Sequence, residues 1–158
     1  MNLNFFTTLT FILYFCSATI FGESSTVSSL ISHTKNSSDA SQLYCLGGMG
    51  ENDSSLFSVS QLNTTTHQWK SLHGMTTPKY LFGATVIEKK IYVCGGYTGN
   101  EQLNLLEVFD CESNSWTELA PMPHPRYSFG MTTLNEDIYV VGGSEDSLIR
   151  LESVLKYS

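Results

Sequence analysis

The sequence predicts an all-β protein that forms a partial β-propeller, about two and a half four-stranded antiparallel blades in an open arc. Paired glycines recur at spacings of 48 and 47 residues, at Gly47-Gly48, Gly95-Gly96 and Gly142-Gly143. Trp69 and Trp116 are 47 residues apart, and aligning residues 69–98 with 116–145 gives 13 identities in 30 positions without a gap. A period of about 40 to 50 residues built from short apolar runs is typical of a radial array of small sheets.

Each repeat is expected to contribute four strands, A to D. In the second repeat these strands cover, in order, residues 80–87, 91–94, 105–109 and 115–119. Strand B is apolar without alternation and contains Tyr92, matched by Tyr139 in the third repeat. Such a strand must be covered on both faces, because exposing one large side chain costs roughly 1.5–3 kcal/mol, and stacked blades supply that cover. The paired glycines after strand B are expected to take positive φ and to admit a neighbouring backbone. Trp69 and Trp116 are expected to pack between blades.

Residues 1–41 precede the repeats. The apolar stretch from Phe5 to Phe21 favours a signal peptide over residues 1–22, cleaved after Ala18 or Gly22, because a membrane span needs roughly 20 mostly apolar residues. An uncleaved anchor or a non-native leader remains an alternative, and no stable span is expected after cleavage. The Ser/Thr-rich residues 23–41 are expected to be a linker. The repeats then fill residues 42–158, divided at about 42–72, 73–119 and 120–158.

By this count the third repeat ends before its fourth strand. Four blades of 47 residues need roughly 188 residues, more than the roughly 136 that follow the leader. We therefore expect a fragment of a larger propeller. Two alternatives are self-association of chains through the open blade faces and low stability of the chain alone.

Charge and motifs exclude several functions. The chain has 8 Lys and Arg against 15 Asp and Glu, and this net charge of −7 argues against binding nucleic acid. No nucleophile elbow or phosphate loop occurs, and the histidines show no metal-ligand spacing. They are His33, His67, His73 and His124. We therefore expect no catalysis, no cofactor and no metal.

The cysteines and the glycosylation sequons favour different compartments. Cys45, Cys94 and Cys111 remain after leader cleavage, and the glycine alignment places Cys45 and Cys94 on opposite strand faces. Buried, unbridged cysteines would suit a reducing compartment. Sequons in linker or turn positions favour the secretory pathway instead. They lie at Asn36, Asn52 and Asn63.

The order of these motifs resembles Kelch repeats, and most closely those of BTB-Kelch proteins. The motifs run in the order of an apolar strand with Tyr and Gly-Gly, a Glu-Val-Phe-Asp run at residues 107–110, a Trp, and then Met-x-x-Pro-Lys/Arg-Tyr. The resemblance covers residues 42–158. The chain departs from the family in having no BTB or BACK segment and in placing Lys79 where a repeat usually has Arg. The first repeat is also weak, with Cys45-Leu46 in place of a β-branched pair.

The resemblance implies a protein-binding face. Strand alternation brings the B–C and D–A loops to one end of the blades, here residues 49–54, 72–79, 97–104, 120–126 and 144–150. On these loops Tyr97, Arg126 and Arg150 are the expected contacts with a protein partner. The alternative for Arg126 and Lys79 is that they tie adjacent blades together by hydrogen bonds.

We therefore predict a non-catalytic protein-interaction module that enters the secretory pathway. One alternative is a cytosolic substrate-recognition fragment of a BTB-Kelch adaptor for a cullin ubiquitin ligase. The other is a fragment of a Kelch enzyme, sugar-acting or copper-dependent, although a copper ligand set of His and Tyr cannot be assembled from the sequence.

Overall fold

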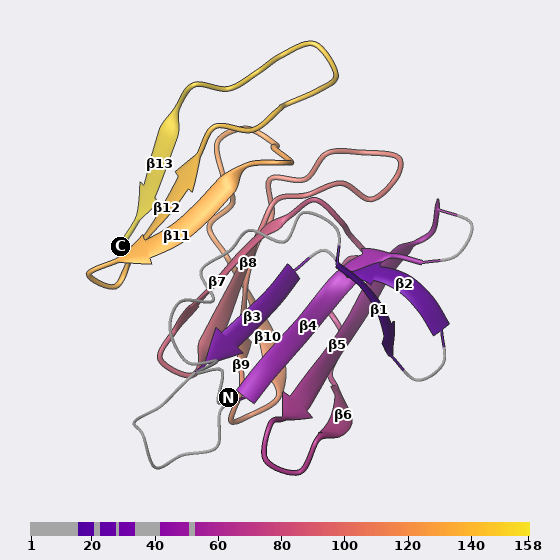
Figure 1. The fold of residues 1–158 in the computed structure, drawn as a ribbon. Helices are drawn as coiled ribbons and strands as arrows, with labels where there is room; N and C mark the ends of the chain where they lie inside the picture. The colour runs from indigo at the N-terminus through magenta and orange to yellow at the C-terminus, as the bar shows by residue number, and fades with distance from the viewer. Residues whose placement is uncertain (1–15, 21–22, 28, 34–41, 51–52) are drawn as a thin grey trace, which may run out of the picture.

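The computed structural model describes residues 16–20, 23–27, 29–33, 42–50 and 53–158, and it confirms the predicted all-β class (Figure 1). Its strands are β1 (Cys16–Ile20), β2 (Glu23–Val27), β3 (Ser29–His33), β4 (Gln42–Met49), β5 (Ser55–Asn63), β6 (Gln68–Leu72), β7 (Gly83–Ile87), β8 (Lys90–Cys94), β9 (Leu106–Asp110), β10 (Ser115–Leu119), β11 (Gly130–Leu134), β12 (Asp137–Val141) and β13 (Val154–Tyr157). The described residues include no helix that could cross a membrane.

The second repeat forms one complete antiparallel sheet, which we call blade 2. Its strands follow the order β10-β9-β8-β7 and match the predicted strands D, C, B and A. Strand β8 is buried on both faces, with Ile91, Val93 and Cys94 inaccessible to solvent. Its unbroken apolar run is therefore explained by cover from both sides, as the sequence predicted.

Blade 1 is more complete than the sequence predicted. Strands β4, β5 and β6 supply its strands B, C and D, and β3 pairs with β4 from Ser29↔Leu46 to His33↔Gln42. Strand β3 thus holds the strand A position that β7 holds beside β8. It lies inside residues 23–41, for which we expected a linker. Backbone pairing, which needs no repeat motif, accounts for this strand in a Ser/Thr-rich segment.

Two further strands lie upstream of β3. Strand β1 pairs with β2 over five positions, from Cys16↔Val27 to Ile20↔Glu23. Strand β2 then meets β4 at Thr26↔Met49. Strands therefore cover the end of the expected leader and part of the expected linker.

Blade 3 contains three strands in the order β11-β12-β13. They correspond to strands A, B and C, as the sequence predicted. Strand β12 pairs with β11 from Gly130↔Val141 to Leu134↔Asp137, and with β13 from Ile138↔Tyr157 to Val141↔Val154.

Two apolar clusters lie where the blades stack. The first joins blades 1 and 2 and includes Leu46 and Val59 from blade 1 with Ile91, Val93 and Phe109 from blade 2. The second joins blades 2 and 3, and its buried members are Cys94, Leu106, Met122, Ile138 and Val140. Each sheet is thus stabilised mainly by apolar packing against the neighbouring sheet, as expected for a repeat array.

The paired glycines form a second connection between blades. Gly47 and Gly95 have φ of +50° and +61°, and a Cβ on them would lie 2.8 and 2.4 Å from the carbonyl oxygens of Lys79 and Arg126. The next glycine of each pair donates to the same carbonyl, from Gly48 N to Lys79 O at 3.2 Å and from Gly96 N to Arg126 O at 2.9 Å. Positive φ and close backbone approach explain why glycine is needed here.

Candidate functional site

The loops gather at two ends of the blades. At one end the D–A and B–C loops pair through reciprocal backbone hydrogen bonds, at 3.0 and 2.8 Å between Tyr80 and Tyr97 and at 3.0 Å between Tyr127 and Ser144. At the other end the amide of Cys111 donates to the carbonyl of Lys89 at 3.0 Å, which joins the C–D and A–B turns. We call the first end the loop face.

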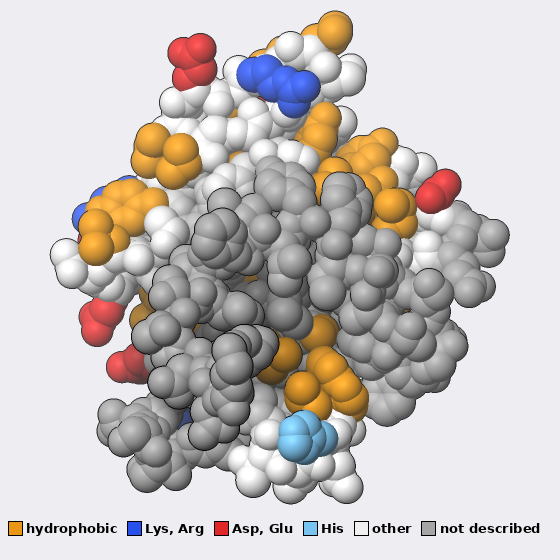
Figure 2. All heavy atoms as spheres, viewed as in Figure 1, with side chains coloured by type: hydrophobic (Ala, Val, Ile, Leu, Met, Phe, Trp, Pro, Cys, Tyr) orange, Lys and Arg blue, Asp and Glu red, His pale blue; other side chains and the backbone are white. Residues whose placement is uncertain are grey.

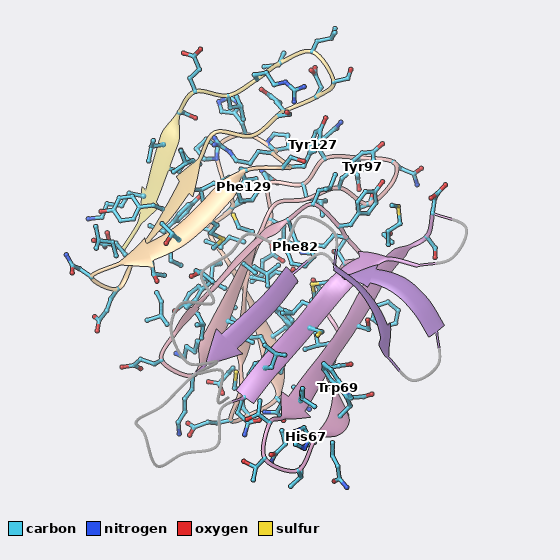
Figure 3. All side chains as sticks on the ribbon, viewed as in Figure 1. His67, Trp69, Phe82, Tyr97, Tyr127 and Phe129 are labelled. Atoms are coloured by element: carbon cyan, nitrogen blue, oxygen red, sulfur yellow. The ribbon has the colours of Figure 1, made fainter. Side chains whose placement is uncertain are left out.

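Three tyrosines form a row on the loop face. Tyr80 and Tyr97 meet edge to face, with ring centroids 5.6 Å apart, and Tyr97 and Tyr127 are 5.9 Å apart. Figure 3 shows Tyr97 and Tyr127 together at the end of the molecule opposite His67. All three side chains are half-buried. Partial burial, with smaller contributions from Tyr97 and Asp53, raises the pKa of Tyr80 above its usual value.

The loop at residues 144–150 adds apolar side chains beside this row. The amides of Leu148 and Ile149 each donate to the Asp146 carboxylate at 2.7 Å, and these two bonds hold the pKa of Asp146 below its usual value. The Tyr127 hydroxyl donates to the Asp146 carbonyl at 3.2 Å, which ties the loop to the row. Leu148 is 88% exposed and Ile149 is also exposed. The loop therefore presents two apolar side chains to solvent.

The structure brings together two of the three expected contact residues. Arg150 is exposed and its guanidinium donates to the hydroxyl of Ser144, whose backbone pairs with Tyr127. Tyr127 in turn contacts Tyr97. Tyr97 and Arg150 thus belong to one surface.

Arg126 is placed differently from our expectation. Its side chain is 1% exposed and donates to the Gly142 carbonyl at 3.1 Å and to the Ser153 hydroxyl at 3.2 Å. A guanidinium enclosed in this way cannot contact a partner. Its carbonyl binds Gly96 of the preceding blade, so Arg126 links its own blade to its neighbour. This geometry agrees with the alternative reading.

Lys79 plays the same role one repeat earlier. Its ammonium forms a buried ion pair with Glu107 on β9, and Thr76 donates to the other oxygen of that carboxylate. Its carbonyl accepts from Gly48 of blade 1. The side chain therefore holds the D–A loop against its own blade, while the backbone holds the preceding blade.

The tryptophans occupy equivalent places on their strands. Trp69 lies opposite Leu62, and Trp116 lies opposite Phe109 with ring centroids 5.1 Å apart. The indole nitrogen of Trp116 donates to the His73 carbonyl at 3.0 Å, which joins blade 2 to the loop leaving blade 1. The expected packing between blades is thus observed for Trp116.

Two of the three described cysteines lie in the core. Cys45 and Cys94 are both buried, no disulfide joins them, and Cys111 is half-buried. Burial raises the pKa of the Cys94 thiol to about 12, against which the nearby cations Arg126 and Lys79 act only in part. Cys94 is therefore a protonated core side chain at neutral pH.

Asn63 is the one expected glycosylation position within the described residues, because Asn36 and Asn52 lie outside them. It ends β5, and its side-chain oxygen accepts from the amides of Thr65 and Thr66 at 2.9 and 3.0 Å. These bonds use the oxygen, whereas a glycan attaches to the nitrogen. The turn that follows is exposed.

His67, His73 and His124, whose side chains the structure describes, do not converge. His67 and His73 are exposed at a turn and in a loop, and His124 lies 3.7 Å from the Glu145 carboxylate at the surface. In the part of the chain that the structure describes, no three His, Cys, Asp or Glu side chains are grouped to hold a metal ion.

Sequence reasoning missed Tyr80 and Tyr127 of the loop face, and it placed Leu148 and Ile149 in a loop of that face without singling them out as contacts. A signal was present for each. The tyrosines follow the repeated Pro-Lys and Pro-Arg pairs, and the two apolar residues interrupt a polar loop. Their proximity, however, depends on pairing between loops that are distant in the chain.

Comparison with known proteins agrees with this architecture. A model of the KLHDC2/KLHL20/DRC7 Kelch-repeats domain matches residues 19–158, a segment that includes β3. The chain is 38% identical over 82 residues to Kelch-like protein 40 of Xenopus laevis, 35% over 72 residues to Kelch-like protein 41a of Danio rerio, and 37% over 80 residues to an F-box/kelch-repeat protein of Arabidopsis thaliana. These matches cover 52%, 46% and 49% of the chain but 13%, 12% and 23% of the relatives. The chain thus spans less than a quarter of each relative's length.

Proposed function

This chain belongs to the Kelch-repeat family, and from that membership we propose that it is a non-catalytic module that binds a protein partner through its loop face. The observation that carries the proposal is the row of Tyr80, Tyr97 and Tyr127 beside Arg150 and the exposed Leu148. Aromatic residues and Arg dominate binding energy at protein interfaces, where apolar neighbours exclude water from them.

The positions of the three tyrosines support the proposal as well as their residue type. Backbone pairs fix Tyr80 to Tyr97 and Tyr127 to Ser144, so the row is held before a partner arrives. A pre-ordered surface loses less conformational entropy on binding. The loops at residues 95–105 and 142–153 differ in length between blades, which is typical of binding loops on a rigid scaffold.

Proximity labelling with the tagged chain tests this proposal. The variants Arg150→Glu and Leu148→Ser change exposed side chains, so folding should be retained and is checked by circular dichroism. The matched control is Glu112→Gln, at the opposite end of blade 2. We expect the parent chain and the control to label the same set of proteins. The labelling signal of these proteins should fall at least about tenfold with the loop variants, since hot-spot losses exceed about 1.4 kcal/mol. Equal labelling by all four chains would contradict the proposal.

We further infer that the chain enters the secretory pathway. The apolar leader and the exposed turn after Asn63 support this. When the chain is expressed in animal cells with a C-terminal tag, treatment with an N-glycosidase should lower its mass. The Asn63→Gln variant should lose less mass than the parent chain, by the mass of one glycan. Asn100→Gln, which alters an exposed Asn outside any sequon, is the control. A chain without any glycan, recovered from the cytosol, would contradict the inference.

The relatives favour a second candidate. Two are Kelch-like proteins and one is named for an F-box beside its Kelch repeats. Under this reading the loop face recognises substrates for a cullin ubiquitin ligase in the cytosol. The glycan experiment separates the two candidates, because both use the same surface but in different compartments.

A further inference from the structure

The cation of the D–A loop has a different environment in blades 2 and 3. Lys79 and Arg126 lie 47 residues apart and occupy the same place in their repeats. In blade 2 the Lys79 ammonium pairs with the Glu107 carboxylate on β9. The register of β12 with β13 shows that the equivalent residue of blade 3 is Leu155. None of the ion pairs formed among the described residues includes Arg126.

A second polar group of blade 2 is also replaced in blade 3. Thr76 donates to the other oxygen of the Glu107 carboxylate, and its equivalent 47 residues later is Pro123, which has neither a hydroxyl nor an amide hydrogen. Among the described residues the Arg126 guanidinium donates to neutral acceptors, a backbone carbonyl and a serine hydroxyl. Blade 2 thus neutralises its cation with a carboxylate, whereas the described part of blade 3 offers no negative charge at the same place.

Burial makes this positive charge costly. Arg126 is 1% exposed, and its Nε is a buried nitrogen without a hydrogen-bond partner among the described residues. A guanidinium keeps its proton in proteins, so Arg126 cannot become neutral as a buried lysine can. Buried charges are paired in proteins because an isolated charge loses its hydration without compensation. The site therefore favours an anion that the blade itself does not supply.

Other proton donors lie at the same junction of blades 2 and 3. The Tyr157 hydroxyl is also buried without a partner among the described residues, and its side chain packs against the cluster that contains Cys94. Burial raises the pKa of the Tyr157 hydroxyl and of the Cys94 thiol, and the positive charge of Arg126 opposes both shifts. The guanidinium, the hydroxyl and the thiol thus lie within electrostatic reach of one another.

The two arginines of this region differ in the size of anion that can reach them. Arg150 is exposed in the 144–150 loop, and Figure 2 shows basic side-chain atoms (blue) at the surface over this loop, at the top of the view. Arg126 is enclosed between that loop and its own blade. An acidic side chain or a phosphate group of a macromolecule cannot reach it there, whereas a single-atom anion can enter when the loop opens locally.

We propose that a chloride ion binds to the Nε of Arg126 at the junction of blades 2 and 3, in place of the carboxylate that Glu107 supplies in blade 2. The ion neutralises the guanidinium, and the Tyr157 hydroxyl is its second donor. Because the Arg126 carbonyl also binds Gly96, the ion stabilises the contact between the two blades. This site goes beyond the loop face, since it is buried and uses none of the exposed contacts.

Thermal unfolding of the 158-residue chain in equal concentrations of sodium chloride and sodium gluconate tests the proposal. Leu155→Glu and Leu155→Gln form a matched pair of nearly equal shape, of which only the glutamate supplies a carboxylate near Arg126. Tyr157→Phe removes the second donor and introduces the residue type that β9 carries at the equivalent position. Arg150→Gln removes an exposed cation of the same blade and controls for anions bound at the surface.

For a dissociation constant of about 10 mM, about 150 mM chloride should raise the Tm of the parent chain by about 3–6 °C above its value in gluconate. The rise should persist in Leu155→Gln and Arg150→Gln, shrink in Tyr157→Phe and disappear in Leu155→Glu. An equal rise in Leu155→Glu would assign it to a general salt effect and overturn the proposal. Equal Tm values of the parent chain in the two salts would overturn it as well.

Bromide locates the site directly, because it replaces chloride and is identified in crystals by its anomalous scattering. In crystals of the parent chain grown in sodium bromide, we expect a bromide beside the Arg126 Nε. Crystals of Leu155→Glu grown in the same way should lack it, while bromides at exposed cations such as Arg150 should be unchanged. Bromide bound only at the surface of the parent chain would contradict the proposal, whatever the thermal data show.

Discussion

The buried ion pair between Lys79 and Glu107 allows a quantitative test of how the blades are held. Glu107→Leu removes the carboxylate and leaves the Lys79 ammonium in a site closed to solvent. Leucine is the residue that the chain itself places at the equivalent position of blade 3, since Leu155 lies opposite Val140 as Glu107 lies opposite Val93. The substitution is therefore compatible with the local backbone.

The expected cost follows from the burial of both groups. Breaking a fully buried pair costs about 3–5 kcal/mol, because the remaining charge has lost water without gaining a partner. For a chain of this size, 1 kcal/mol lowers Tm by roughly 2–4 °C, so Glu107→Leu should lower Tm by about 6–20 °C. The double variant Lys79→Met with Glu107→Leu removes both charges and should lie within about 1 kcal/mol of the parent chain.

Urea denaturation of the four proteins measures this coupling through a double-mutant cycle. The exposed pair Lys89–Glu112 supplies the control cycle, and its coupling should lie between about 0 and 1 kcal/mol. If the two buried substitutions destabilise additively, so that the double variant is the least stable of the four, the ion pair does not hold the D–A loop and our account of Lys79 is wrong.

Three other outcomes follow from neighbouring features. Gly95→Ala should destabilise more than Gly142→Ala by urea denaturation, because its Cβ would lie 2.4 Å from the Arg126 carbonyl whereas that of Gly142 is 3.4 Å from the nearest atom. The pKa of Cys94 rises from 9.0 to about 12 on burial, so the stability it contributes is complete below about pH 9 and lost as pH rises toward 12. Melting curves should show this loss, and Cys94→Ala should reduce it. Finally, Leu155→Glu should give a higher Tm than Leu155→Gln at neutral pH, since Leu155 and Arg126 hold the positions that the ion pair Glu107 and Lys79 holds in blade 2, and the difference should narrow as pH falls below about 4.

The repeat pattern predicted blades 2 and 3 because their strands and turns keep one spacing. It did not predict β3, since five residues of Ser29–His33 carry no repeat motif and their pairing with β4 is a long-range contact. A pattern along the sequence cannot predict a strand that is identified only by its pairing with a distant strand.

The candidate site was predicted less completely than the fold. Arg126 was expected to contact a partner because it lies on a predicted binding loop and Arg is common at interface hot spots, but the Gly142 carbonyl and the Ser153 hydroxyl enclose it. These acceptors come together only after strands β12 and β13 form. The contact of Tyr97 with Tyr127 likewise depends on how two blades stack, which spacing along one chain does not specify.

The hydrogen bond from the paired glycines to the following loop restricts where the chain can change length. The D–A connections at residues 73–82 and 120–129 are equal in length, because each must deliver one carbonyl to the preceding blade and one cation to its own. The B–C connections at residues 95–105 and 142–153 differ in length, but their ends also bond to other loops, as where the carbonyls of Leu103 and Asn104 accept from the amides of Arg126 and Met122. Insertions and grafted peptides should therefore be accepted in the exposed middle of the B–C loops, at residues 99–100 and 147–148, where recognition can be diversified without disturbing how one sheet sits on the next.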